Sequence, residues 1–466
     1  MKDKITVTVD GQKKYAEPST VLAEIISCER PCGGHGKCGK CKVLVNGREE
    51  LACSYIVRSD IEVITKGIGN IHIETGVEEK GEISDNLCFA LDIGTTTLAL
   101  ALVSLDRKEV VRVLTASNPQ RKFGADIMTR IEYCQKNSVG ELHRVIVERI
   151  NEMLAEFKVG KLKNIFVSAN VTMLHTLFGI DCSSMGTAPY TPSFLDYKEE
   201  SAEALGLIGV EKVISLPSIS SFVGADIVAG LNYIGMPEAG KYNLLVDLGT
   251  NAEIVLYSPS SGLATAAAAG PCFEGANISY GMSATDGAIY AFELNNGEAV
   301  YKTIENKKPV GICGTGLIDI ISELLKNGVI EETGFMEEDY IITEDVILSR
   351  EDVRRYQLAK SAIYSAIHSL IKSEGVNFDD ISALYISGGF SSKINVKNAA
   401  NSGLIPKELV QKTHALNNTS LQGVIKFACG ENATQSFVKL IKSVDLSQNQ
   451  YFNTLFIENM LFDIGE

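Results

Sequence analysis

The sequence predicts a small α+β domain at the amino terminus, followed by a larger α/β domain built as two lobes. Four cysteines lie in and just after a glycine-rich loop near the start of the chain. An apolar strand that ends in Asp-x-Gly-Thr occurs twice further on, around Asp92 and Asp247. An acidic stretch without hydrophobic periodicity separates the cysteines from the first of these strands, as expected of a linker between domains.

These observations divide the 466 residues into four parts. We expect a cysteine-bearing domain over residues 1–72 and an acidic, mobile linker over residues 73–87. The first lobe then covers residues 88–241, and the second lobe covers residues 242–466 with helices that connect the two.

The small domain reads as strands around one short helix. Apolar residues alternate with polar ones over residues 5–9, and the turn Asp10-Gly11 returns the chain as a strand over residues 12–15. Ser19 and Thr20 are candidate caps for a helix that ends at Ile26. After the cysteine loop, strands are predicted at the following positions: residues 43–45, 51–56 and 61–64, with the turn Asn46-Gly47 after the first.

The cysteines indicate an iron-sulfur site. Cys32, Cys38 and Cys41 share the glycine-rich loop, and Cys53 follows the hairpin. A cluster needs four converging thiolates, and the small residues between them let backbone N–H groups point at the inorganic sulfurs. A structural zinc site or disulfides are the alternatives, but zinc more often takes two separated pairs of ligands. Cys28 is left over, and we expect it to pack beneath the loop.

This strand order and the Cys-x5-Cys-x2-Cys spacing resemble the β-grasp fold of 2Fe-2S ferredoxins, in the branch of adrenodoxin. The resemblance implies that Cys32, Cys38, Cys41 and Cys53 bind a 2Fe-2S cluster. The distance to Cys53 is shorter than in ordinary ferredoxins, which argues against a free-standing electron shuttle.

Charge and hydropathy exclude several classes of function. The net charge is −15, and residues 1–80 hold 12 basic and 12 acidic residues, so the excess lies entirely in the remainder. Such an acidic body argues against nucleic acid as a partner. A charged amino terminus and the absence of a long apolar run predict a cytoplasmic protein without membrane contact. Near the cluster, Arg30, Lys37, Lys40 and Lys42 form either a solvated rim or a docking edge for an acidic redox partner.

The two Asp-x-Gly-Thr segments predict a phosphate-binding site. A strand that turns sharply at glycine presents backbone N–H groups and threonine hydroxyls to phosphate oxygens, while its aspartate faces a metal ion. Two copies, each followed by an apolar strand, are much stronger evidence than one. The candidate residues are Asp92, Gly94, Thr95, Thr96 and Thr97 in the first copy, and Asp247, Gly249, Thr250 and Asn251 in the second.

Two further glycine turns are candidates for nucleotide contact. Gly388 and Gly389 end an apolar strand, where glycine lets the backbone approach a nucleoside closely. Gly314 and Gly316 open a helix whose amino terminus could face phosphate or ribose, although a plain tight loop explains them equally well.

The order of these segments resembles the superfamily of sugar kinases, heat-shock ATPases and actin, whose lobes have a ribonuclease H-like fold. The resemblance implies ATP and Mg²⁺ as ligands, with Asp92 and Asp247 as catalytic residues that bind Mg²⁺ and orient water. It also assigns residues 222–230 and 421–430 to two connector helices between the lobes, which could shear against each other on nucleotide exchange.

Two other residues remain open. His175 falls on a mostly apolar helix, where a structural core histidine is the favoured interpretation. Glu274 is the one carboxylate of the segment 269–278, and it could be a metal or water ligand or a surface residue.

Nearly the whole chain resembles the reductive activators of corrinoid proteins, on the motifs at residues 170–175, 224–227, 269–276 and 311–316. The resemblance implies an ATP-hydrolysing iron-sulfur activase that returns cob(II)amide to cob(I)amide. Its partners would be the corrinoid protein of a methyltransferase system and an upstream low-potential electron donor, and a homodimer is left open. The short linker predicts that the extra middle domain of longer members is missing.

Other functions remain as alternatives. One is an ATP-dependent electron donor to another low-potential enzyme, such as an acyl-CoA dehydratase. Another is a non-catalytic, redox-sensing ATP-binding regulator. A small-molecule kinase is disfavoured, because the cluster would then have no task.

Overall fold

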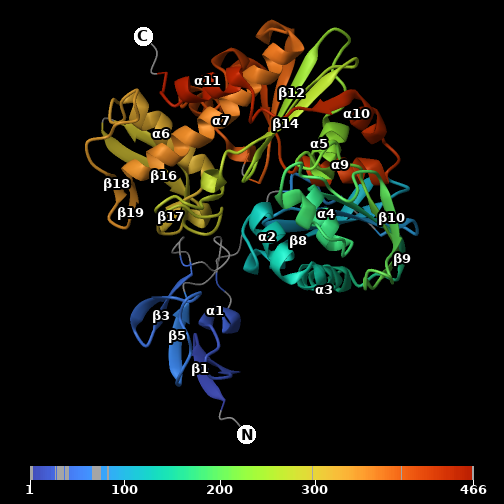
Figure 1. Ribbon diagram of the computed structural model, residues 1–466, viewed down its shortest axis with the longest axis vertical. Coiled ribbons are helices and arrows are strands. Elements are labelled where there is room, and N and C mark those ends of the chain that lie inside the picture. Colours follow the sequence, from blue (N-terminus) through green and yellow to red (C-terminus); the bar gives the residue numbers. More distant parts are fainter. Residues whose placement is uncertain are drawn as a thin grey trace.

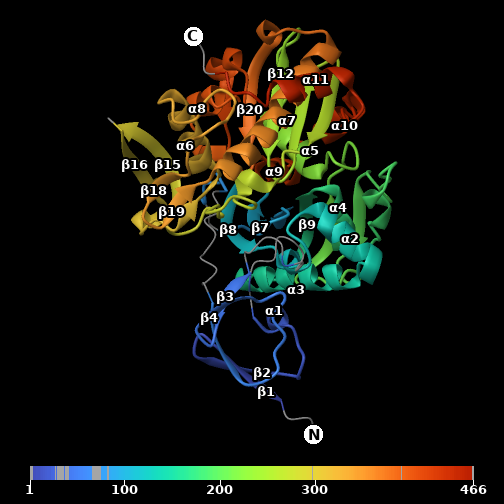
Figure 2. The same cartoon turned by 60° about the vertical axis from the view of Figure 1, so that its left-hand side comes forward.

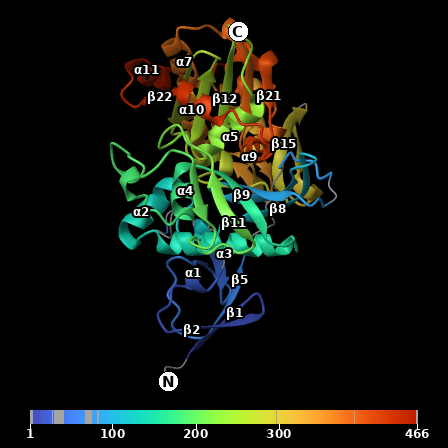
Figure 3. The same cartoon turned by 90° about the vertical axis from the view of Figure 1, so that its right-hand side faces the viewer.

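The computed structural model describes residues 4–26, 28, 36, 41–65, 75–80, 83–295, 297–389 and 391–463. A small amino-terminal domain lies apart from a larger two-lobed body in all three views (Figures 1, 2 and 3). In Figure 3 the second lobe lies above the first, and the small domain lies below both.

The small domain is a five-stranded mixed sheet in the order β2-β1-β5-β3-β4. Strands β1 and β5 are parallel, and the other neighbours are antiparallel. Alternating residues of β1, β3 and β5 are buried together with Leu22, which is why the pattern of alternation was visible in the sequence. The elements are β1 (Ile5–Val9), β2 (Gln12–Ala16), α1 (Leu22–Ile25), β3 (Lys42–Val45), β4 (Arg48–Leu51) and β5 (Ile61–Thr65).

Two details of this domain differ from the sequence prediction. The strand after Asn46-Gly47 is β4, Arg48–Leu51, rather than residues 51–56, because both turn residues adopt positive φ and the chain reverses in two residues. Helix α1 has Val21 at its N-cap without a side-chain cap. The Thr20 hydroxyl donates instead to the Glu17 carbonyl, so the predicted capping by Ser19 or Thr20 is wrong.

The first lobe is a six-stranded sheet in the order β10-β11-β9-β6-β7-β8. Strands β6, β7 and β8 form an antiparallel meander, whereas β9 is parallel to both β6 and β11. Every residue of β6 is buried, as expected for a central strand covered on both faces. The elements are β6 (Leu87–Ile93), β7 (Thr97–Ser104), β8 (Glu109–Ser117), α2 (Ile127–Asn137), α3 (Gly140–Glu156), β9 (Leu162–Ala169), α4 (Val171–Leu177), β10 (Lys198–Ser201) and β11 (Val210–Ser215).

The second lobe repeats this topology. Its sheet has the order β21-β20-β12-β13-β14-β22, again with an antiparallel meander, and parallel strands β20 and β21 beside the first strand. The two Asp-x-Gly-Thr segments therefore end the equivalent central strands β6 and β12. The elements of this sheet are β12 (Tyr242–Leu248), β13 (Ala252–Tyr257), β14 (Gly262–Ala267), β20 (Ile381–Ser387), β21 (Thr413–Ala415) and β22 (Ile441–Ser443).

Smaller elements complete the second lobe. Helix α7 packs against β13 and β14, whereas α6 is buried almost completely and packs against β15; both helices belong to the largest apolar core among the described residues. The remaining elements are β15 (Ala288–Asn295), β16 (Glu298–Thr303), β17 (Gly311–Ile312), α6 (Gly314–Lys326), β18 (Tyr340–Thr343), β19 (Val346–Leu348), α7 (Arg350–Glu374), α8 (Val396–Asn401), α10 (Thr434–Leu440) and α11 (Gln450–Glu458).

Two helices, α5 (Ala225–Ile234) and α9 (Thr419–Ala428), pack against each other between the lobes, as Figure 1 shows. Each helix crosses to the opposite lobe. Helix α5 follows the first lobe, yet Ile227 and Leu231 pack into a core with Leu245 of the second. Helix α9 follows the second lobe, yet Leu421 and Val424 pack into the core of the first. These are the two helices that the sequence assigned as connectors.

Part of the predicted linker contacts the first lobe. The Lys80 N–H donates to the Val110 carbonyl over 2.9 Å, and a Glu79 carboxylate oxygen accepts from the Val113 N–H over 2.8 Å. Val77 packs against the core of that lobe. Residues 77–80 thus run along edge strand β8, although the sequence predicted a mobile segment there.

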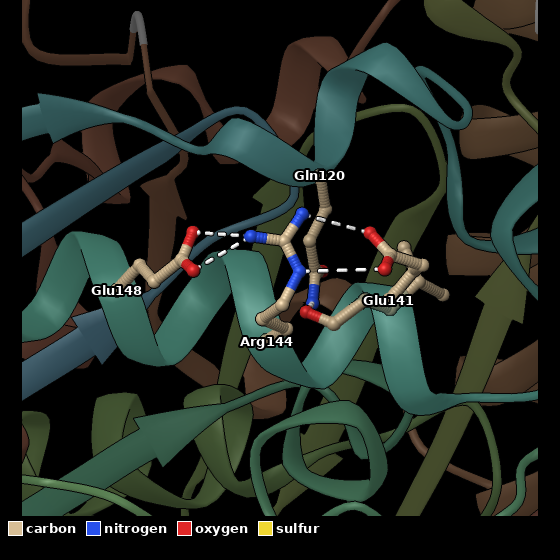
Figure 4. A network of polar contacts seen from close by, with 5 residues as sticks. Gln120, Glu141, Arg144 and Glu148 are labelled. Carbon is tan, nitrogen blue, oxygen red and sulfur yellow. Dashed lines mark hydrogen bonds and ion pairs between the residues drawn. The ribbon is translucent and has the colours of Figure 1, made fainter.

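The outer face of α3 is highly charged. Arg144 lies between Glu141, at 2.9 Å, and Glu148, at 2.6 Å (Figure 4). Gln120 is fully buried nearby and donates from Nε2 to the Leu142 carbonyl over 3.0 Å. The exposed pairs contribute little to stability, whereas the buried amide ties the loop after β8 to α3.

No described helix combines the length and the apolar character that crossing a membrane would require.

The crossing of α5 and α9 depends on Gly423. A Cβ built there would lie 1.8 Å from the Ala229 carbonyl oxygen, so Gly423→Ala must push the helices apart. We expect a loss of about 1–3 kcal/mol in stability and a lower Tm, measured by thermal unfolding. Gly140→Ala, at the start of α3, is the control: its nearest atom is 3.8 Å away, and the Tm should be unchanged or slightly higher. An equal Tm for Gly423→Ala and the native chain would contradict the close crossing.

Candidate functional site

A cavity of about 240 Å³ lies between the lobes, where the carboxyl ends of β6 and β12 face each other. Both phosphate-loop candidates line it, together with the Gly-Gly turn after β20. The predicted residues on its wall are Asp92, Gly94, Thr95, Thr96, Thr97, Asp247, Gly249, Thr250, Asn251, Gly314, Gly388 and Gly389.

In both candidate phosphate loops the glycine N–H closes the turn on a carbonyl further along the loop, three residues on in the first loop and two residues on in the second. The Gly94 N–H donates to the Thr97 carbonyl over 2.9 Å, and the Gly249 N–H donates to the Asn251 carbonyl over 2.9 Å. A Cβ on Gly94 would lie 2.9 Å from the Thr97 carbonyl oxygen, so this turn needs glycine. The repeat in the sequence is therefore also a repeat in structure, on opposite walls of one cleft.

The third glycine turn also lines the cavity. Gly388 has φ +122°, and a Cβ there would lie 2.2 Å from the Leu248 carbonyl oxygen, so only glycine fits against the second phosphate loop. Gly316 does not line the cavity. A Cβ there would lie 2.1 Å from the Ile289 carbonyl oxygen, which gives this glycine a packing reason, while Gly314 at the start of α6 does reach the cavity.

Asp92 is held by side chains that come from the far end of the sequence. Asn418 Nδ2 donates to Asp92 Oδ2 over 2.7 Å, and Ser420 Oγ donates to Asp92 Oδ1 over 2.6 Å. Ser420 Oγ is also 2.7 Å from Ser168 Oγ on β9. Both carboxylate oxygens of Asp92 are thus fixed by the first turn of α9, and sequence reasoning did not identify Asn418 or Ser420.

Four more carboxylates face the same cavity. Asp247 accepts a hydrogen bond from the Ser387 hydroxyl, and Glu253 lies directly opposite Asp247 in the antiparallel pair of β12 and β13. Asp226 lies in the first turn of α5. Glu274 Oε2 accepts from Thr250 Oγ1 over 2.5 Å, so Glu274 belongs to the site rather than to the surface.

Burial raises the pKa of these carboxyl groups, and neighbouring negative charge adds to the shift for Asp92, Asp226 and Glu253. Burial, followed by the charge of Asp247, raises the pKa of Asp226 to about 7. Burial raises the pKa of Asp92 to about 6, although its two hydrogen bonds oppose the shift. Burial and the charges of Asp226 and Asp247 raise the pKa of Glu253 well above its usual value. The group would be stabilised in its ionised form by a divalent cation, because hard oxygen ligands suit Mg²⁺.

Arg130 on α2 supports the first phosphate loop from behind. It is fully buried, and it donates from Nη2 to the Thr95 carbonyl over 2.5 Å and from Nε to the Gly124 carbonyl over 2.9 Å. Burial lowers its pKa to about 9. The sequence gave no signal for this residue, since its partners come from separate loops.

His175 is a core residue, as the sequence favoured. It is fully buried and stacks on Phe194 with ring centroids 4.5 Å apart. Its Nδ1 lies 2.8 Å from the Val171 carbonyl, and its Nε2 accepts from the Ser193 N–H over 3.0 Å. Both ring nitrogens are therefore used in packing the loop after α4.

Two of the four predicted cluster ligands, Cys32 and Cys38, lie outside the described residues. The other two, Cys41 and Cys53, lie side by side at the end of the hairpin, and their thiols interact. Burial, with smaller contributions from Cys53 and Cys28, raises the pKa of Cys41 to about 11. Two thiols brought together by β3 and the turn after β4 suit a shared metal site, because a metal would deprotonate them and remove this penalty. Among the described residues no group of three or more metal-ligating side chains is found.

Comparison with known proteins places both lobes in one family. Residues 241–464 match a family model described as the C-terminal domain of RACo, the ASKHA domain, and residues 87–239 match the RACo middle region. The match to the middle region contradicts the expectation that a middle domain is missing, because that region forms the first lobe here.

Two proteins with similar sequences carry names that refer to corrinoid activation or reduction. The corrinoid activation enzyme RamQ of Eubacterium limosum is 28% identical over 80% of this chain and 70% of its own. A [Co(II) methylated amine-specific corrinoid protein] reductase of Methanosarcina barkeri is 24% identical over 79% of this chain and 75% of its own. A solved structure titled reductive activator for corrinoid, iron-sulfur protein covers 98% of both chains at 24% identity, with a TM-score of 0.73, and so shows the fold.

The raised pKa values of Asp92 and Asp226 predict how pH affects cation binding. Protons compete with Mg²⁺ for these carboxylates, so the affinity for Mg²⁺ should fall as pH decreases from 8 to below about 6. Without cation, a carboxyl with a raised folded pKa contributes stability at low pH that is lost as pH rises through that pKa. Asp226→Asn should therefore raise the Tm of the metal-free protein at pH 8 and weaken Mg²⁺ binding, as measured by thermal unfolding and calorimetry. Glu211→Gln, which changes an exposed carboxylate, should alter neither, and a pH-independent affinity would contradict the carboxylate site.

Proposed function

We propose that this chain, which belongs to the RACo family, is an ATP-hydrolysing reductive activator of a corrinoid protein. It would reduce cob(II)amide to cob(I)amide by one electron through a 2Fe-2S cluster. The observation that carries the proposal is the meeting of two phosphate loops in one carboxylate-lined cleft, in a chain that also brings cysteines together in a separate small domain. The names of the two relatives support a corrinoid protein as the partner.

The cleft residues have distinct tasks in binding Mg·ATP. Backbone N–H groups and hydroxyls of the two loops would hold phosphate oxygens from opposite walls. Because no three described side chains are grouped closely enough to hold a metal ion by themselves, Asp92, Asp226 and Asp247 would bind the Mg²⁺ of Mg·ATP mainly through its water ligands, and would orient the attacking water. The Gly388-Gly389 turn would allow close approach of the nucleoside. Hydrolysis breaks the bond between the β- and γ-phosphates, adds water and releases ADP and phosphate.

The small domain is proposed to be a β-grasp 2Fe-2S ferredoxin domain. Its sheet order and the paired thiols of Cys41 and Cys53 support this, with Cys32 and Cys38 as the remaining ligands. When bound, the cluster would supply a one-electron carrier of low potential. The electron would come from an upstream low-potential donor, and each electron delivered would convert one cobalt(II) to cobalt(I).

The energetics explain why a nucleotide is needed. Plant-type 2Fe-2S centres have potentials near roughly −400 mV, and the reduction of cobalt(II) is harder. A shortfall of about 100 mV for one electron corresponds to roughly 2.3 kcal/mol. A conformation that binds the corrinoid protein more tightly in one state can offset such an amount. We therefore propose that ATP changes the affinity of this protein for the corrinoid protein and takes no part in the chemistry at cobalt.

The test is a spectroscopic reduction assay. Reduced full-length protein is mixed with a cob(II)amide-containing corrinoid protein, with and without Mg·ATP, and the visible spectrum is followed. We expect cob(I)amide only with ATP, and a loss of about 10²–10³-fold in rate for Asp247→Asn, because a charge-stabilising group is removed. Cys53→Ser should abolish reduction while ATP hydrolysis persists, and Glu211→Gln should behave as the native chain.

Each contrary outcome points to a different function. Equal rates with and without ATP would reject the coupling. ATP-dependent binding without repeated electron transfer would indicate a redox-sensing regulator. Activity with another low-potential acceptor, but not with a corrinoid protein, would indicate a different electron-accepting partner.

A further inference from the structure

The segment from Leu416 to Ser420 contacts three separate parts of the protein. On the second lobe, the Leu416 N–H donates to the Ile386 carbonyl of β20 over 2.8 Å, and the Leu416 carbonyl accepts from Ser391 Oγ over 2.6 Å. Ser391 Oγ also bonds the Gly388 carbonyl over 2.9 Å. The start of this segment is therefore tied to the third glycine turn of the nucleotide cleft.

Its other end is tied to the first lobe. Asn418 and Ser420 donate to the two carboxylate oxygens of Asp92, over 2.7 and 2.6 Å. Asn418 also caps α9, because its Oδ1 accepts from the Leu421 N–H over 2.8 Å. Ser168 Oγ links Ser420 to the first residue of α5 through the Ala225 carbonyl, at 3.2 Å. The amino termini of both connector helices thus converge on Asp92.

Between these two attachments, Asn417 contacts the segment that leads from the cysteine-bearing domain. Gly76 has φ +65°, and a Cβ there would lie 2.3 Å from Asn417 Cβ. Three and four residues later the same segment is anchored to β8 through Glu79 and Lys80. The position of Gly76 is therefore set by Asn417 on one side and by the first lobe on the other.

The side-chain oxygen of Asn417 lacks a hydrogen-bond partner within the described part of the chain. This Oδ1 atom is buried. A buried acceptor without a partner costs about 1–3 kcal/mol. Such an atom needs an explanation, and a second arrangement of this segment that gives Asn417 a partner would be one.

From these contacts we propose that Asn418 and Ser420 are positioning residues for Asp92, and that the segment 416–420 transmits closure of the nucleotide cleft to residues 75–80. The proposal rests on the proposed function, because it assigns ATP to the cleft and the electron carrier to the amino-terminal domain. It supplies the physical link between them.

The lobes are packed so closely at the connector helices that they cannot move without displacing residues 416–420. Gly423 and Ala229 are in direct backbone contact, and a Cβ at Gly230 would lie 2.9 Å from Thr419 Oγ1. A shear of α9 against α5 must therefore displace Asn417 and Asn418 together. Because tightly packed elements switch between discrete arrangements, a small shift at Asp92 becomes a change of contact at Gly76.

The first experiment measures hydrogen exchange of the peptide containing residues 75–80 in the full-length protein. A non-hydrolysable ATP analogue with Mg²⁺ should slow exchange there by about tenfold, as closure tightens the contact with Asn417. The double variant Asn418→Ala with Ser420→Ala should bind the analogue more weakly, so it is studied at an analogue concentration that saturates it, and exchange at 75–80 should then no longer respond. Binding of the analogue is measured separately by calorimetry.

The second experiment separates positioning from folding. Ser420→Ala should lower kcat of ATP hydrolysis by about 10- to 100-fold with little change in KM, because a hydrogen bond to a charged carboxylate is lost. Ser420→Thr keeps the hydroxyl and should restore most of kcat. A merely structural role would lower the Tm of both variants without this split between kcat and KM.

The third experiment perturbs the contact from the other side. Gly76→Ala should speed exchange at 75–80 and remove its response to the nucleotide analogue. Gly240→Ala is the matched control, because this glycine also has positive φ but has no atom within 4 Å of the added Cβ. The control should retain the response.

The outcomes distinguish the two proposals. If the native chain binds the analogue and exchange at 75–80 does not change, the transmission is wrong while the proposed function stands. If the native chain fails to bind Mg·ATP at all, the proposed function is wrong and the transmission falls with it. A response that persists in the double variant would also overturn the role of Asn418 and Ser420.

Discussion

The burial of five carboxylates in one cleft is the constraint on which the rest of this structure depends. Asp92, Asp226, Asp247, Glu253 and Glu274 all face a cavity of about 240 Å³, and burial raises the pKa of each. The protein must either protonate some of them or bind a cation, since isolated buried charges are strongly disfavoured. A cation that arrives with a polyphosphate satisfies both partners, because the phosphate brings further negative ligands and the loops bring N–H donors. The closed cleft is therefore less stable without a ligand, and the free energy of ligand binding can shift the positions of the two lobes.

The two connector helices determine which movements of the lobes are possible. Each lobe is joined to a helix that packs into the core of the other, so the lobes cannot separate without breaking apolar contacts on both sides. What remains possible is a shear along the crossing of α5 and α9, where backbone meets backbone at Gly423 and Ala229. Buried side chains such as Asn232, which donates to the Glu431 carbonyl over 2.9 Å and accepts from the Ala433 N–H over 2.8 Å, keep that crossing specific. Neutralising the carboxylates in the cleft can therefore move the lobes only by this shear of α9 against α5.

Sequence reasoning recovered the features that are local in the chain. The two phosphate loops, the Gly-Gly turn and the connector helices each occupy a short run, where the strand pattern and the glycines carry the signal. It missed the residues whose function arises from contacts between distant segments. Asn418 and Ser420 reach Asp92 across 326 and 328 residues, and no periodicity reports such a pairing. Arg130 was missed for the same reason. Its acceptors are the backbone carbonyls of Gly124 and Thr95, and every residue has such a carbonyl, so the residue types around Arg130 do not reveal the contact. The strand β4 was misplaced because a two-residue turn allows the strand to begin at once at Arg48.

The separation of the two chemistries within one chain poses the remaining physical problem. If the small domain, which has its own core, holds the proposed cluster, the potential of that cluster would be set locally by the surrounding thiolates and hydrogen bonds. The nucleotide cleft cannot change that potential directly across a domain boundary, but it can change where the small domain lies. Electron transfer depends on the approach of donor and acceptor, so control of position is control of rate. The anchoring of residues 77–80 along β8 places this attachment next to Gly76, which lies against Asn417 in the segment that holds Asp92. A linker attached at that point would respond to the cleft, whereas one attached elsewhere on the acidic surface would not.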